Sequence, residues 1–286
     1  MLVIAGADQA GKNVQVPEVW TGGGWRALTG ARRILPYYPR TFLAPNGRVF
    51  YAGDQRATHY LNTAGSGSWS AVGSRKFGSR DYGSAVMYLP GKVLYAGGGR
   101  TTRTAETIDL NAAAPAWQWT GSMAHPRRHL NATVLPTGEV LVTGGSRGTT
   151  FNEPNLAVRV AEIWNPESGV WTSLASNAVN RTYHATSLLL PDGRVLHTGS
   201  SDALQPTGEP APPQRNAELF SPPYLFKGAR PGISSAPSSI SYGRSFLVGT
   251  PASSAIAASP RRAAESRSRR PRVATARRRG ITCCSW

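Results

Sequence analysis

The chain has 286 residues, of which 40% are hydrophobic, and a formal net charge of +17. This hydrophobic content is enough for a core, and 31 glycines with 22 prolines suit a turn-rich all-β protein better than a helical one. There is no apolar run of about 18 residues, so the composition excludes a transmembrane helix. We expect no membrane span.

The positive charge is concentrated at the C-terminal end of the chain. Residues 261–286 hold nine arginines and one glutamate, and the remaining basic residues are scattered over turns and strand ends. A nucleic-acid-binding surface usually gathers its charge on one face of a folded domain. We therefore expect no nucleic-acid partner.

The cysteine pattern offers no disulfide framework and no zinc site. The two cysteines, Cys283 and Cys284, are adjacent in the basic tail. The N-terminus also lacks the charged region, apolar region and cleavage site of a secretory signal.

A hairpin pattern recurs four times along the chain. Each copy is an apolar run, a short Pro/Gly turn, a second apolar run and a closing glycine, which predicts a β-hairpin. Before them, residues 1–6 (MLVIAG) align with the second half of such a copy, so we expect the first hairpin to have its partner strand ahead of residue 1. The four full copies are residues 37–54, 80–98, 126–145 and 181–199.

Two further segments follow the hairpins. A short apolar segment with an Ala-Glu pair occurs at 104–110, 160–166 and 216–222. A tryptophan then marks a fourth segment, and we expect these tryptophans to pack between neighbouring sheets rather than to stack on a ligand. They are Trp25, Trp69, Trp117 and Trp171. Four strands per repeat, at spacings of this size, are typical of a β-propeller blade.

The composition of the sequence changes near residue 222. Residues 200–216 form a polar, proline-rich insertion, and residues 223–251 combine closely spaced prolines with short β-like pieces that resemble the start of a sandwich. From 252 to 286 the chain consists mainly of Ala, Ser, Arg and Pro, a composition that predicts disorder.

The repeats resemble kelch motifs, and residues 215–251 resemble the junction between propeller and Ig-like early-set domain in galactose oxidase and glyoxal oxidase-like proteins. The resemblance implies an all-β chain in three parts: an incomplete kelch-type propeller over 1–222, the start of an early-set β-sandwich over 223–251, and a disordered basic tail over 252–286. One hypothesis for the tail is a frameshift near residue 251, which the nucleotide sequence would test.

Those families are copper radical oxidases, and the resemblance implies oxidation of primary alcohols or aldehydes by O₂ with release of H₂O₂. It also implies an extracellular location. Tyr183 and His184 match the family's adjacent axial tyrosine and copper histidine, so Tyr183 is the candidate catalytic base and both residues are candidate metal ligands. The family's thioether-linked Cys–Tyr pair and its second histidine have no counterpart here. We therefore expect this chain to bind copper weakly and to be inactive alone.

The residues leave other interpretations open. Counting back from the turns places Tyr82 in the slot of Tyr183, and Gly83 and His129 in the slot of His184, so Tyr183 could simply pack at the head of an inner strand. Two adjacent strand residues face opposite sides, so both can reach one metal only where the chain bends. A surrogate histidine pair, His129 and His184, is also conceivable.

The alternative function is a non-catalytic propeller that binds carbohydrate or a cell-wall polymer through its loops. The exposed faces of an incomplete propeller are apolar, which predicts self-association of the chain.

Overall fold

The computed structural model describes residues 1–200, 213–228, 245–246 and 274–275. In these residues the fold is all-β, with short 3-10 turns η1 (Thr29–Ala31), η2 (Pro154–Leu156) and η3 (Pro223–Phe226). No helix in the described part is long and apolar enough to cross a membrane.

Five antiparallel sheets follow one another along the chain. The first sheet contains β1 (Leu2–Val3), β2 (Glu18–Trp20) and β3 (Trp25–Ala27). The second contains β4 (Thr41–Leu43), β5 (Val49–Tyr51), β6 (Ala57–Asn62) and β7 (Ser68–Ser74). The third contains β8 (Ser84–Leu89), β9 (Lys92–Ala96), β10 (Ala105–Asp109) and β11 (Gln118–Trp119). The fourth contains β12 (Asn131–Val134), β13 (Val140–Thr143), β14 (Val160–Trp164) and β15 (Trp171–Ser176). The fifth contains β16 (Thr186–Leu189), β17 (Val195–Thr198) and β18 (Ala217–Phe220).

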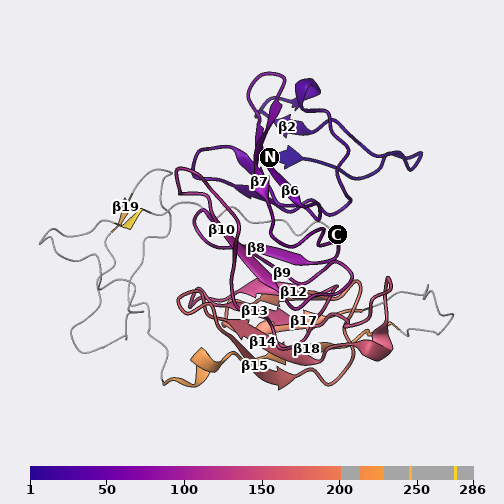
Figure 1. The fold of residues 1–286 in the computed structure, drawn as a ribbon, viewed down its shortest axis with the longest axis vertical. Coiled ribbons are helices and arrows are strands. Elements are labelled where there is room, and N and C mark those ends of the chain that lie inside the picture. Colours follow the sequence, from indigo (N-terminus) through magenta and orange to yellow (C-terminus); the bar gives the residue numbers. More distant parts are fainter. Residues whose placement is uncertain (201–212, 229–244, 247–273, 276–286) are drawn as a thin grey trace, which may run out of the picture. The chain divides into compact units, whose positions relative to one another are not determined.

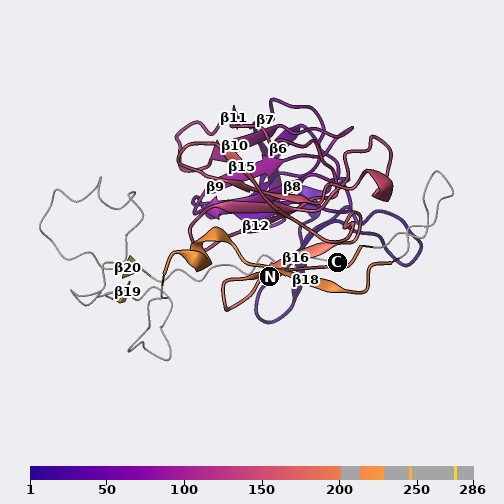
Figure 2. The same ribbon diagram turned by 90° about the horizontal axis from the view of Figure 1, so that it is seen from below.

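Each sheet is a simple meander in which strands adjacent in sequence pair with each other. The sheets succeed one another in chain order (Figure 1). The first strand of the fourth sheet, β12, lies beside β8 on one side and β16 on the other (Figure 2). Sheets that meet through their first strands are arranged as the blades of a propeller. The all-β prediction and the four hairpins are thus confirmed, whereas the kelch subclass stays a prediction.

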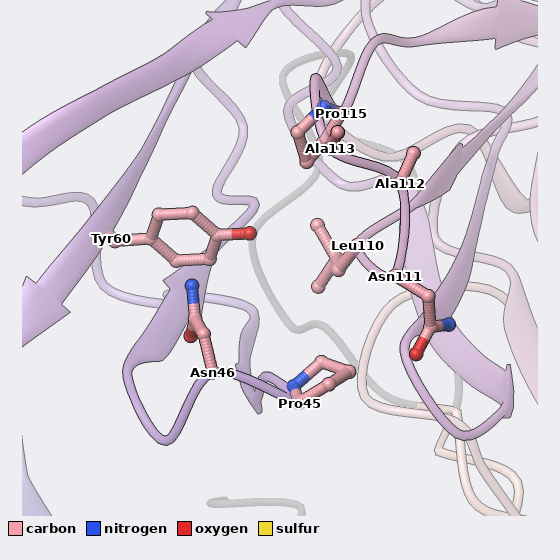
Figure 3. A pocket seen from close by; sticks show the side chains of 8 residues that line it. All are labelled: Pro45, Asn46, Tyr60, Leu110, Asn111, Ala112, Ala113 and Pro115. Atoms are coloured by element: carbon pink, nitrogen blue, oxygen red, sulfur yellow. The ribbon is translucent and has the colours of Figure 1, made fainter.

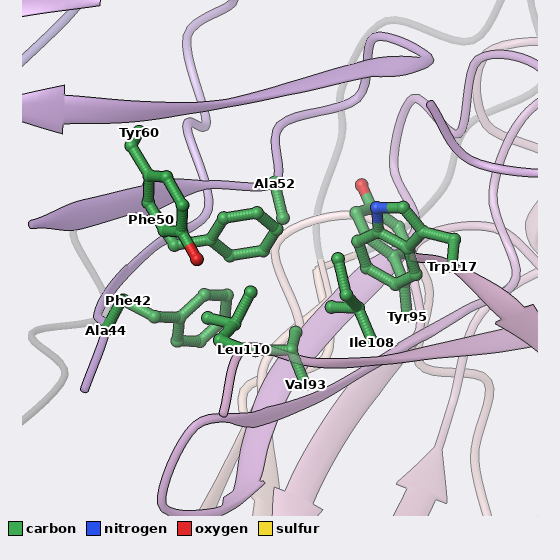
Figure 4. Packing of buried hydrophobic residues seen from close by; sticks show 10 residues of the cluster. All are labelled: Phe42, Ala44, Phe50, Ala52, Tyr60, Val93, Tyr95, Ile108, Leu110 and Trp117. Atoms are coloured by element: carbon green, nitrogen blue, oxygen red, sulfur yellow. The ribbon is translucent and has the colours of Figure 1, made fainter. Parts of the chain in front are cut away.

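The core lies between neighbouring sheets because a single sheet cannot bury both of its faces. Between the second and third sheets, Phe50 and Tyr60 pack against Val93 and Trp117 (Figure 4). The Trp117 side chain is fully enclosed, and its indole Nε1 donates a hydrogen bond to Thr58 Oγ1 at 3.3 Å. This tryptophan therefore packs between sheets, as the sequence predicted.

The other repeat tryptophans follow the same rule with one exception. The Trp69 indole N–H donates to the carbonyl of Ala31 at 2.8 Å, and that of Trp171 donates to the carbonyl of Gly121 at 2.7 Å. Both acceptors belong to the segment that follows the preceding sheet. Trp25 differs, because 46% of it is exposed on the first sheet. The packing prediction is therefore wrong for Trp25, since no described segment covers that face.

A second compact unit begins at Pro222. Its described elements are η3 and the two-residue strands β19 (Ser245–Phe246) and β20 (Ala274–Thr275), which pair antiparallel. Most of 223–251 and 252–286 lies outside the described residues, as does most of the 200–216 insertion. The early-set domain and the disordered tail therefore stay predictions.

Candidate functional site

A tight turn leads into each innermost strand. Tyr38, Tyr82, His129 and His184 each lie the same number of residues before the closing glycine of their hairpin. Three of these residues have left-handed backbone conformations, with φ of +55° at Tyr82, +59° at His129 and +62° at His184. Positive φ is uncommon for residues other than glycine, and it often marks a functional site. The four turns therefore carry equivalent positions at the start of the inner strands.

This equivalence corrects one register in the sequence analysis. Tyr82, not Gly83, occupies the slot of His184, because Tyr82 has the positive φ and lies two residues before its strand, as His184 does. The turn of the fifth sheet also has one residue more between its arginine, Arg181, and the left-handed residue than the turns of the third and fourth sheets have. Tyr183 is that additional residue.

Buried ion pairs fix these turns to their sheets. The arginine of each turn contacts the glutamate of the Ala-Glu pair on the third strand of the same sheet. The pairs are Arg80–Glu106 at 2.9 Å, Arg127–Glu162 at 2.5 Å and Arg181–Glu218 at 2.8 Å. Each arginine also donates to main-chain carbonyls of its own sheet, so its position is held at several points. The repeated glutamate therefore positions the turn that carries the candidate site.

Tyr183 lies at the centre of an aromatic cluster. Its hydroxyl is 3.1 Å from the hydroxyl of Tyr38, which comes from the second sheet. Its ring makes edge contacts with rings from the third and fourth sheets. The centroid distances are 5.9 Å to Tyr82, 5.0 Å to His129 and 4.9 Å to Phe151. Four successive repeats therefore contribute to one cluster at the inner rim.

His184 stacks on Tyr183, with ring centroids 3.8 Å apart and an interplanar angle of 29°. The main-chain N–H of Ala185 donates to the carbonyl of Thr182 at 3.2 Å, which closes a turn around the two residues. The chain therefore bends at Tyr183 and His184. His184 is exposed, whereas Tyr183 is half-buried.

His129 is held by a hydrogen bond to the main chain. Its ring is almost fully buried, and its Nε2 is hydrogen-bonded to the carbonyl oxygen of Phe151. Because a carbonyl oxygen only accepts, Nε2 carries the proton, and Nδ1 is the nitrogen that keeps a lone pair. The surrogate pair of His129 and His184 stays a hypothesis, in which Nδ1 of His129 would be the nitrogen that binds the metal.

Charged residues flank the cluster on the side of Tyr82. The Arg128 guanidinium lies 5.0 Å from the centroid of the Tyr82 ring and pairs with Asp81 at 2.8 Å. Burial raises the pKa of Tyr82, with a further contribution from Tyr38, and Arg128 opposes this shift. Tyr82 is therefore a neutral phenol at physiological pH.

The donor chemistry of Tyr183 and His184 fits copper. Imidazole suits this metal, and a phenolate oxygen is a hard donor that suits its oxidised state. Tyr38 would be a further oxygen donor near this pair, since its hydroxyl lies 3.1 Å from that of Tyr183. In the part of the chain that the structure describes, no group of three His, Cys, Asp or Glu residues could hold a metal. Tyr183 and His184 are therefore only part of the set of donors that a copper site needs.

A separate pocket of about 430 Å³ lies at the opposite ends of the inner strands (Figure 3). Pro45 and Asn46 line it from the turn after β4, and Tyr60 and Asn111 line its other sides. Gly91 has a φ of +75° there, and a Cβ would come within 3 Å of both Pro45 and Asn111. The pocket belongs to the turn ends of the second and third sheets, away from Tyr183.

Comparisons with known proteins show similarity to galactose and glyoxal oxidases. The family model described as "Glyoxal oxidase N-terminus" matches residues 99–224, a range that includes Tyr183 and His184. A galactose oxidase of Gibberella zeae is 32% identical over 196 residues, which are 63% of this chain and 28% of that protein. An aldehyde oxidase of Arabidopsis thaliana is 34% identical over 153 residues, 49% of this chain and 25% of that protein. The chain thus spans about a quarter of the length of these relatives.

Two solved structures resemble this chain in fold. A fungal alcohol oxidase of the AA5 family, in complex with copper, matches with a TM-score of 0.71 and 25% identity, over 82% of this chain and 54% of that one. The structure of YjhT, at 13% identity and a TM-score of 0.56, shares the fold alone.

Proposed function

We propose that this chain, a copper radical oxidase-like protein related to galactose and glyoxal oxidases, provides the Tyr183–His184 part of a copper site for the oxidation of primary alcohols or aldehydes. The observation that carries the proposal is the tandem Tyr-His on a left-handed turn at the inner rim of the sheets. Both residues fall within the range matched by the glyoxal oxidase model.

The two residues have different roles in this proposal. His184 is exposed, so one of its ring nitrogens would bind the metal, while its stacking on Tyr183 limits the orientations of the imidazole. Tyr183 is the general base, and its phenolic oxygen shares a hydrogen bond with Tyr38 that can stabilise the phenolate. When bound, copper would accept one of the two electrons that are removed from the alcohol or aldehyde before O₂ is reduced to H₂O₂. The resemblance implies that the family's Cys–Tyr pair accepts the other electron, and that pair has no counterpart in this chain.

The donor set leads us to propose weak copper binding and no turnover for this chain by itself. A tight metal site needs a full set of ligands supported by an ordered second layer of contacts. Tyr183, His184 and the nearby Tyr38 form a partial set. We also propose, from the kinship with secreted oxidases, an extracellular location and no nucleic-acid partner.

A Cu(II) titration of the full chain, followed by electron paramagnetic resonance, tests the ligand assignment. We expect one weakly held Cu(II) ion whose nitrogen signal is lost in His184→Gln and retained in His125→Gln, a histidine in the loop before β12. A signal unchanged by His184→Gln would refute the site. A peroxide-release assay on primary alcohols and aldehydes should be negative, and turnover would overturn the proposed lack of activity.

A further inference from the structure

The contact between the third and fourth sheets has a simple composition. On the third sheet, Val86 and Leu94 lie in one cross-strand row. On the fourth sheet, Trp164 and Trp171 are paired across β14 and β15. The four side chains belong to one hydrophobic cluster. A branched aliphatic row on one sheet therefore receives a tryptophan pair from the next.

The fifth sheet presents the same aliphatic row without a partner in the described residues. Leu188 pairs with Leu196, and Leu196 pairs with Leu219. Leu188 and Leu196 are at the positions of Val86 and Leu94, counted from the left-handed residue and from the closing glycine. Leu188 is 58% exposed and Leu219 is 48% exposed. We call Leu188, Leu196 and Leu219 the leucine row.

The exposure of the leucine row is unusual for this position in the fold. On the fourth sheet the same row is formed by Thr133, Leu141 and Ile163. All three side chains are buried. The row equivalent to the leucine row is therefore covered on the fourth sheet, whereas the leucine row itself is exposed.

The first sheet presents the matching aromatic pair. Trp20 and Trp25 are paired across β2 and β3, as Trp164 and Trp171 are across β14 and β15. Their rings make an edge contact at 5.6 Å, and 42% of Trp20 and 46% of Trp25 are exposed. Their neighbour Val19 packs toward the second sheet, so the two tryptophans lie on the opposite face. We call Trp20 and Trp25 the tryptophan pair.

We propose that the leucine row of one molecule binds the tryptophan pair of a second copy of this chain. The contact repeats the internal packing of the third sheet on the fourth. Exposed apolar faces with large aromatic anchors are typical of protein interfaces. The two surfaces differ, so the association is head-to-tail, and an open assembly keeps one free surface at each end. Such contacts produce rings or open chains rather than closed dimers. This proposal does not depend on copper.

Sedimentation velocity of the full chain over a range of concentrations tests the association. We expect species larger than dimers that grow with concentration. Leu188→Glu/Leu219→Glu should make the chain monomeric, and so should Trp20→Gln/Trp25→Gln. Leu43→Glu and Trp119→Gln change exposed side chains outside both surfaces and should leave the association intact. Circular dichroism of each variant confirms that it is folded.

Mixing the two interface variants gives the sharper test. The leucine variant keeps its tryptophan pair, and the tryptophan variant keeps its leucine row, so the mixture should form a 1:1 complex that grows no further. A wild-type chain that stays monomeric at every concentration would overturn the proposal, and would point to coverage by the chain's own residues. Self-association that persists in either variant, or a mixture that stays monomeric, would also overturn it.

Discussion

The hydroxyl groups of Tyr38 and Tyr183 lie 3.1 Å apart although the residues are separated by 145 positions in the sequence. Tyr38 precedes the first strand of the second sheet, and Tyr183 precedes the first strand of the fifth. Their contact shows that the turns before the inner strands converge, so that residues from distant repeats reach one site. The hydrogen bond also gives the candidate base a specific partner.

We predict that this hydrogen bond is measurable as a coupling between the two tyrosines. In a double-mutant cycle with Tyr38→Phe and Tyr183→Phe, the coupling in the free energy of unfolding should be about 0.5–1.5 kcal/mol. Urea denaturation of the four proteins measures it. A parallel cycle that replaces Tyr37→Phe, the more exposed neighbour of Tyr38, should give a coupling near zero. Equal couplings in the two cycles would contradict the contact.

The buried ion pairs should be essential for folding stability. Replacing Glu162 by Gln leaves Arg127 charged and enclosed, so we expect a loss of about 3–5 kcal/mol. Lys92–Asp109 is a matched pair on the surface, at 3.3 Å, and Lys92→Met should change stability by less than about 1 kcal/mol. Chemical denaturation compares the two. Similar losses in the two variants would show that the enclosed pair has no special role.

A buried histidine should make stability depend on pH. Burial and the nearby Arg181 lower the pKa of His197 from 6.5 to about 4. The unfolded chain takes up a proton as the pH falls below 6.5, whereas the folded chain does so only near pH 4. Stability should therefore fall between these values, by about 3 kcal/mol from this residue. His197→Gln should flatten the curve of unfolding free energy against pH. An unchanged slope in His197→Gln would refute the assignment.

Trp117 and Trp119 should differ in their contribution to stability. Trp117→Ala removes a fully buried side chain between the second and third sheets, so it should destabilise the chain by about 3–5 kcal/mol. Trp119→Ala, two residues later and half exposed, should lie within about 0.5 kcal/mol of wild type. Thermal unfolding of the two variants measures both losses of stability. A larger loss in Trp119→Ala than in Trp117→Ala would contradict the prediction.

Much of the candidate site could be predicted, but not all. The tandem Tyr183–His184 is visible in the sequence because the pair is adjacent and precedes a hairpin. The role of Tyr38 could not be seen, because its partner lies three repeats away. Phe151 lies in an irregular loop and carried no signal. The arginine–glutamate pairs did leave a signal in the sequence, since an arginine precedes three hairpins and an Ala-Glu pair recurs after them. Spacing alone does not show that the arginine and the glutamate are in contact.

By itself the sequence determined the local elements: the hairpins, the third strands with their Ala-Glu pairs, and the fourth segments marked by tryptophan. These depend on period-2 hydrophobicity and on turn chemistry, which act between near neighbours. Only the tertiary structure decided that Trp25 is exposed while Trp117 is enclosed. It also decided that Nε2 of His129 is hydrogen-bonded to a carbonyl oxygen, and that the hydroxyls of Tyr38 and Tyr183 are in contact. Those outcomes depend on which sheet faces which, and contacts between sheets join residues that local patterns cannot relate.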